Sequence, residues 1–162
     1  MESSLLSAFY FNLLQDVNIL RPLIYLLFDD FEINSTIIVS QDFIALDFQG
    51  IWIKEIQEIA KETNSEVIYQ SSLHQIWLYT GQFYSGYIVS ASESDLPSHR
   101  NSHEIFKIIP NNITKITLQH GYECVGFLMN QNQQAKNGSS VSFNADIIVG
   151  WLPVEYQSNL RP

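Results

Sequence analysis

A histidine and a glycine stand side by side where an apolar stretch of the sequence stops. In ITKITLQ (113–119), apolar and polar residues alternate as in a β-strand, and His120 and Gly121 follow directly. Because a neutral imidazole can take a proton from a hydroxyl, we predict that His120 is a general base. Gly121 would let a ligand approach the backbone closely. The alternative is a hydrogen-bonded turn histidine without a chemical role.

Small polar residues also follow three other strand-like stretches, which end near residues 40, 70 and 92. Parallel strands place their carboxyl ends at one edge of a sheet, and ligands bind outside that edge. The sequence therefore predicts a ligand-binding rim that contains Ser40, Gln41, Ser92, Glu93, Gln119, Gly121 and Glu123.

Two histidines, His99 and His103, are spaced so that one face of a helix would carry both, as in some zinc sites. The residues around them do not favour a stable helix, and no third ligand has a matching spacing. We therefore predict no metal site, and a metal enzyme built on this pair is the least favoured alternative. The single cysteine, Cys124, has no basic neighbour and is predicted to be a buried, unreactive thiol.

Sequence motifs for the common nucleotide sites are absent. The sequence contains neither GxGxxG nor GxxxxGK[ST], and it has no GxSxG or CxxC motif. We therefore predict no cofactor and no self-contained catalytic set.

Apolar runs of strand length alternate with helical patterns along the chain. We predict strands at 36–40, 66–70, 86–92, 113–119 and 145–151. Helices are predicted at 4–16, 19–29, 50–63, 73–80 and 103–109, with Pro22 in a first helical turn. This alternation predicts an α/β fold: a Rossmann-like parallel sheet of about five strands with helices on both faces. A similar sheet with one antiparallel edge strand is the alternative.

The whole chain, 1–162, is predicted to form a single domain. Residues 1–30 would be a helical amino-terminal segment, apolar enough to join two copies of the chain into a homo-oligomer. The polar stretch QNQQAKNGSS (131–140) has no apolar periodicity, which predicts a mobile loop.

Composition and charge limit the classes of partner. Apolar residues make up 46% of the chain, so we expect a folded protein. The net charge is −9, with only eight Lys and Arg, which argues against a nucleic-acid partner. Polar residues and Pro22 interrupt the apolar stretch from Leu5 to Phe28, so no transmembrane segment is expected. One cysteine and no basic signal region predict a cytoplasmic protein.

Two stretches resemble the amino-terminal domain of GT-B type glycosyltransferases, above all those of bacterial capsule and surface polysaccharides. They are TLQHGYECVGF (117–127) and FNADIIVGW (143–151). Such enzymes often have a strand that ends in His-Gly, then a loop, then an Ala-Asp that opens the next strand. The matching residues here are Leu118, Gln119, His120, Gly121, Ala145, Asp146 and Trp151.

The resemblance implies transfer of a sugar from a nucleotide-sugar to a hydroxyl acceptor. GT-B enzymes have two Rossmann-like domains, of which the first mainly holds the acceptor and the second the nucleotide-sugar. This chain would then be the acceptor-binding half, inactive alone because the donor-binding domain is expected to be missing. His120 would take the proton of the acceptor hydroxyl or hold the acceptor. Sugar or glycan acceptors would be its partners.

A second hypothesis is a non-catalytic binding or docking module with a flavodoxin-like fold. The apolar first 28 residues favour it, because their surface would seat a partner or a second copy.

Overall fold

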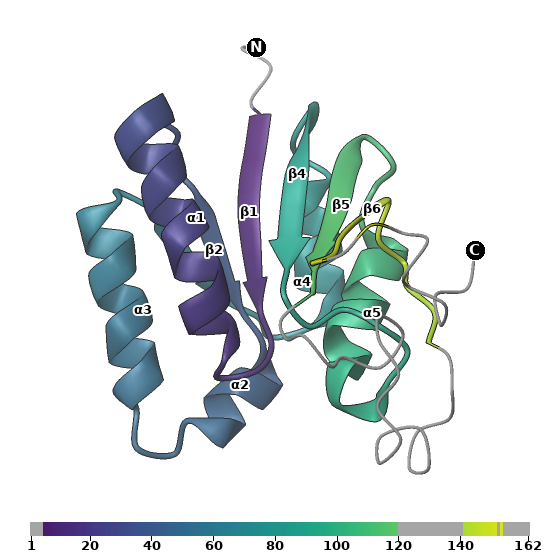
Figure 1. Ribbon diagram of the computed structural model, residues 1–162, viewed down its shortest axis with the longest axis horizontal. Coiled ribbons are helices and arrows are strands. Elements are labelled where there is room, and N and C mark those ends of the chain that lie inside the picture. Colours follow the sequence, from purple (N-terminus) through teal and green to yellow (C-terminus); the bar gives the residue numbers. More distant parts are fainter. Residues whose placement is uncertain (1–4, 120–140, 152, 154–162) are drawn as a thin grey trace.

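The computed structural model describes residues 5–119, 141–151 and 153 (Figure 1). Six strands form one sheet in the order β3-β2-β1-β4-β5-β6, and every neighbouring pair is parallel. The strands are β1 (Leu5–Phe11), β2 (Thr36–Val39), β3 (Glu66–Tyr69), β4 (Ser85–Ser90), β5 (Ile113–Leu118) and β6 (Ile147–Val149). The predicted α/β parallel sheet is confirmed, with one strand more than the five predicted. The alternative with an antiparallel edge strand is wrong for this sheet.

The additional strand is β1, and it corrects the prediction of a helical segment over residues 1–30. Residues 6–11 are buried on both sides of the sheet: Tyr10 belongs to one apolar cluster, and Phe9 and Phe11 belong to the other. A strand covered on both faces is a continuous apolar run, and such a run fits helical spacing equally well. Residues 5–11 are therefore a central strand of the sheet, and the joining of two copies through the amino-terminal segment stays a prediction.

The first helix, α1 (Asp16–Phe31), is longer than predicted. It begins at Asp16, so Pro22 lies inside the helix and not in its first turn, which corrects that prediction. Val17, Leu20 and Ile24 are buried against the sheet. This helix therefore leads directly from the loop after β1 onto one face of the sheet.

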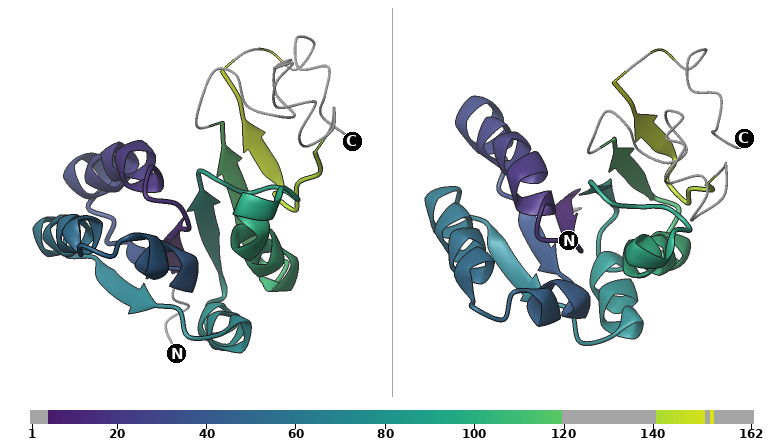
Figure 2. Two further views of the ribbon diagram at one scale, coloured as in Figure 1. Left: turned by 90° about the horizontal axis from the view of Figure 1, so that it is seen from below. Right: turned by 60° about the horizontal axis from the view of Figure 1, so that its bottom comes forward.

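Helices cover both faces of the sheet (Figures 1 and 2). On one face, α1 and α3 (Ile51–Glu62) pack over Phe9, Phe11 and Ile37. On the other, α4 (Leu73–Thr80) and α5 (Arg100–Ile108) pack over Ala8, Tyr10 and Ile88. Two short elements, α2 (Gln41–Leu46) and the 3₁₀ turn η1 (Pro97–His99), were not predicted, and α5 begins three residues before the predicted 103.

One glycine permits the pairing of β1 with β4. Gly86 lies opposite Leu6 and has a φ of +150°. A Cβ built on Gly86 would lie 2.1 Å from the carbonyl oxygen of Leu6, so the two backbones approach too closely for any side chain. The absence of a side chain at Gly86 therefore lets β1 and β4, the two central strands, pair this closely.

The strand order identifies where a ligand is expected. Order 3-2-1-4-5-6 is that of Rossmann folds, with the topological switch point between β1 and β4. It differs from the flavodoxin-like order. The flavodoxin-like fold of the second hypothesis is therefore wrong, and the binding or docking role in that hypothesis stays a prediction. In the described part of the chain, no helix is long and apolar enough to cross a membrane. The predicted mobile loop, 131–140, lies outside the described residues.

Candidate functional site

The candidate site lies at the carboxyl ends of β1 and β4, at the lower edge of the sheet in Figure 1. The turn Asn12–Gln15 leads from β1 into α1, and residues 91–96 lead from β4 into η1. Polar side chains in these two loops and at the first residue of α1 are buried, in contrast to ordinary surface loops. They are Asn12, Asp16, Ser92, Glu93 and Ser94.

Asp16 connects the two loops. Its Oδ2 accepts hydrogen bonds from the backbone N–H groups of Asn12 and Leu13, both at 2.8 Å, and from the Ser92 hydroxyl at 2.9 Å. The carboxyl is fully buried. Burial raises the pKa of Asp16 from 3.8 to about 6, although these hydrogen bonds act to lower it. Asp16 can therefore change protonation state close to neutral pH.

Glu93 pairs with a histidine from the neighbouring helix. Its Oε1 lies 2.7 Å from Nδ1 of His103 in α5 and accepts a 3.0 Å hydrogen bond from the backbone N–H of Asn144. The Asn144 side chain in turn donates to the carbonyl of His103. Burial raises the pKa of Glu93, against the lowering effect of its bonds to Asn144 and His103. The result is a buried carboxyl–imidazole pair next in sequence to Ser92, the residue that donates to Asp16.

Three buried oxygens at this site accept no hydrogen bond in the structure: Asn12 Oδ1, Asp16 Oδ1 and Glu93 Oε2. They are the only such side-chain atoms among the described residues. An unsatisfied buried acceptor costs about 1–3 kcal/mol, and more if it is charged. Asn12 and Glu93 lie in the two loops of the switch point and Asp16 is the first residue of α1, so the cost is concentrated where a ligand is expected.

The remaining polar groups hold the loop after β4 in place. Ser94 hydrogen-bonds Nδ1 of His99 at 2.7 Å, and Ser102 donates to the carbonyl of Ser92 at 2.6 Å. His99 and His103 therefore bind different partners and do not converge on one point. Among the residues that the structure describes, no group of three metal-ligating side chains is found.

Four of the predicted rim residues separate into two groups. Ser92 and Glu93 lie at the site just described. Ser40 caps α2 by accepting from the backbone N–H of Phe43, and Gln41 donates to the carbonyl of Gln70. These two belong to the β2–β3 half of the edge, where their polar groups serve the local structure.

Gln119 directly follows β5 and holds Trp151, which lies two residues beyond the end of β6. Its side-chain Oε1 accepts from the backbone N–H of Trp151, and its carbonyl accepts from the Trp151 indole, both at 2.9 Å. Asp146, part of the family-like stretch, bonds the backbone of Lys115 and so attaches β6 to β5. The predicted base His120, with Gly121 and Glu123, lies outside the described residues.

Asn12 and Asp16 were missed by the sequence reasoning. The reason is the misassigned first strand: without β1, residues 12–16 are not a strand end. An Asn and an Asp after an apolar run of strand length were the available signal. The pairing of His103 with Glu93 was also missed, since it depends on how α5 docks beside β4.

Searches against protein-family models and against curated proteins give no match for this sequence. Its function is therefore argued from the fold and from the geometry at the ends of β1 and β4.

Proposed function

We propose that this chain is the acceptor-binding half of a GT-B type glycosyltransferase and binds a sugar hydroxyl at the ends of β1 and β4. The observation that carries the proposal is the set of three unsatisfied buried oxygens at Asn12, Asp16 and Glu93. These groups need hydrogen-bond donors, and a sugar carries several hydroxyl donors on a small frame. The resemblance of residues 117–127 and 143–151 to such enzymes supports the same function.

Sugar transfer requires that the acceptor hydroxyl lose its proton as it attacks the anomeric carbon. The base implied by the resemblance is His120. The Glu93–His103 pair is a second candidate among the described residues, because a carboxylate that bonds Nδ1 orients the ring and stabilises the imidazolium. In this proposal a second Rossmann-like domain holds the nucleotide-sugar donor.

Acceptor binding is tested by titrating methyl glycosides of glucose, galactose and N-acetylglucosamine, observed by saturation-transfer NMR. Glu93→Gln should weaken binding roughly ten- to a hundredfold, because a hydrogen bond to a charged acceptor is lost. Glu104→Gln is the matched control: Glu104 follows His103 directly, but its side chain is partly exposed and pairs with Lys107. Thermal unfolding of each variant confirms that the fold is intact.

Two results would contradict the proposal. One is equal glycoside affinity in wild type and Glu93→Gln. The other is competition between UDP-glucose and the glycosides for this site, since the donor belongs to the other domain. The base is identified in the enzyme that includes the donor domain: turnover unchanged in His120→Ala removes His120 from the mechanism, and His103→Gln tests the second candidate.

A further inference from the structure

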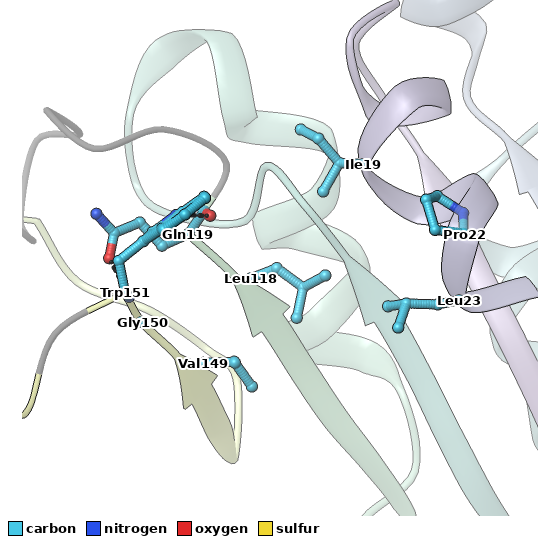
Figure 3. A pocket seen from close by; sticks show the side chains of 8 residues that line it. All are labelled: Ile19, Pro22, Leu23, Leu118, Gln119, Val149, Gly150 and Trp151. Carbon is cyan, nitrogen blue, oxygen red and sulfur yellow. Dashed lines mark hydrogen bonds between the residues drawn. The ribbon is translucent and has the colours of Figure 1, made fainter. Parts of the chain in front are cut away.

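An apolar pocket of about 390 Å³ opens between the first turns of α1 and the ends of β5 and β6 (Figure 3). Its size lies in the range of small-molecule sites, roughly 300–1,000 Å³. Side chains from α1 face those of the two strands across it. The residues used below are Ile19, Leu23, Leu118, Gln119, Val149 and Trp151.

The chemistry of the walls favours an aliphatic occupant. Leu118 and Val149 are paired neighbours on β5 and β6 and point to the same side of the sheet, toward Ile19 and Leu23 (Figure 3). Gln119 is the one polar side chain in the lining, and its Oε1 already accepts from Trp151. Such walls cannot satisfy several hydroxyl groups, so a bare sugar would be poorly bound here.

An exposed aromatic ring at one end of the pocket is held in place. Trp151 is 67% exposed, yet two hydrogen bonds to Gln119 fix both its backbone and its indole N–H. An indole oriented in this way offers apolar surface without first losing conformational freedom.

The pocket and the polar site flank the end of β4. Asp16 and Ile19 are three residues apart on α1, which places them on one side of that helix. Thr117, next to Leu118 on β5, pairs with Ser90 at the end of β4. A ligand whose polar part reaches Asp16 and Glu93 therefore has an apolar surface beside it.

We propose that the pocket takes an alkyl chain attached to the acceptor sugar, so that the substrate class is a glycolipid-like acceptor. This inference rests on the proposed function for the identity of the polar part. It assigns Val149 and Leu118 to the chain, and Asp16 and Glu93 to the sugar.

The test compares methyl β-glucoside, hexyl β-glucoside below its micelle concentration, and 1-hexanol. Methyl-labelled protein is observed by ¹H–¹³C NMR. Hexyl glucoside should shift the methyl signals of Ile19, Leu23, Leu118 and Val149 but not those of Leu73 and Leu78, which are exposed on α4. Each added methylene should tighten binding roughly two- to fourfold, so hexyl glucoside, which has about five more methylenes, should bind at least about thirtyfold tighter than methyl glucoside.

Val149→Lys and Ile147→Lys form a matched pair. Both residues lie on β6, two positions apart, and both are 48% exposed, but only Val149 lines the pocket. The advantage of hexyl over methyl glucoside should disappear in Val149→Lys and persist in Ile147→Lys. If it persists equally in both variants, the proposal is overturned.

Two further outcomes separate this inference from the proposed function. If hexanol shifts the pocket signals and no glucoside responds to Glu93→Gln, the alkyl site is supported while sugar binding at Glu93 fails. If the pocket signals change with protein concentration and not with ligand, a second copy of the chain fills the pocket, and the alkyl proposal is wrong.

Discussion

The hydroxyl of Ser92 donates a 2.9 Å hydrogen bond to Oδ2 of Asp16 and so joins the loop after β4 to the start of α1. Both side chains are buried, with Ser92 only 1% exposed. The two halves of the sheet meet between β1 and β4, so this one bond crosses the switch point.

Removing that hydroxyl should destabilise the protein. Ser92→Ala leaves Asp16 with one donor fewer, and we expect the free energy of unfolding to fall by about 1–3 kcal/mol. Urea denaturation measures the change. Ser71→Ala is the control, because the exposed Ser71 hydroxyl bonds only Gln75, and its loss should cost less than about 0.5 kcal/mol. Equal losses of unfolding free energy in the two variants would show that the Ser92–Asp16 hydrogen bond stabilises the fold no more than an exposed hydrogen bond does.

The raised pKa of Asp16 predicts a pH dependence of stability. The folded protein, with a pKa of about 6 at Asp16, holds this proton more tightly than the unfolded chain, with a value near 3.8. The group therefore contributes stability at low pH that is lost as the pH rises through about 6. The loss amounts to about 3 kcal/mol, since one pKa unit is about 1.4 kcal/mol.

Asp16→Asn isolates this contribution, because asparagine does not titrate. Between about pH 3 and about pH 7, the stability of the variant relative to wild type should rise by about 3 kcal/mol. Denaturation at several pH values measures it, and a ¹³C titration of the Asp16 carboxyl gives the pKa independently. Parallel stability curves for the two proteins would contradict the prediction.

Gly86 and Gly50 provide a matched test of backbone packing. Both have positive φ, but a Cβ at Gly50 meets nothing within 4 Å, whereas at Gly86 it meets the backbone of Leu6. Gly50→Ala should cost about 1–2 kcal/mol from backbone strain alone. Gly86→Ala should cost more than about 4 kcal/mol, because it forces β1 and β4 apart. Similar denaturation midpoints for the two variants would argue against this close contact.

The apolar layer under α5 depends on Phe106. This ring is fully buried among Ile88, Ile105 and the other members of its cluster. Phe106→Ala should reduce the free energy of unfolding by about 3–5 kcal/mol through the cavity that it leaves. Phe48, which is 87% exposed, is the control, and its change to Ala should have an effect below about 0.5 kcal/mol. A mild effect at Phe106 would mean that α5 is not packed as described.

Much of the sheet was predictable because its signals are local. Ile37, Ile38 and Val39 form an uninterrupted apolar run, and all three are buried in β2 as such a run predicts. For residues 5–11 the prediction of a helix was wrong. Leu5, Leu6 and Phe9 also match helical spacing, and only burial from both sides identifies a strand. Single-sequence periodicity cannot separate the two cases.

The site was predictable only in part, for a related reason. Ser92 and Glu93 followed from their place at a strand end, which is a local property. Their partners Asp16 and His103 are distant in the sequence and come into reach only through the order of the strands. The burial that raises the pKa of Asp16 is likewise a tertiary property, absent from the sequence around it.

The central position of β1 has a consequence for synthesis of the protein. This strand is translated before β4 and pairs with β2, but its other edge has no partner until the ribosome has translated the chain through β4. During that interval the nascent chain presents an apolar strand with an unpaired edge, the kind of surface that promotes aggregation. Expression yield should therefore depend on how fast residues 12–84 are translated and on chaperones that shield that edge.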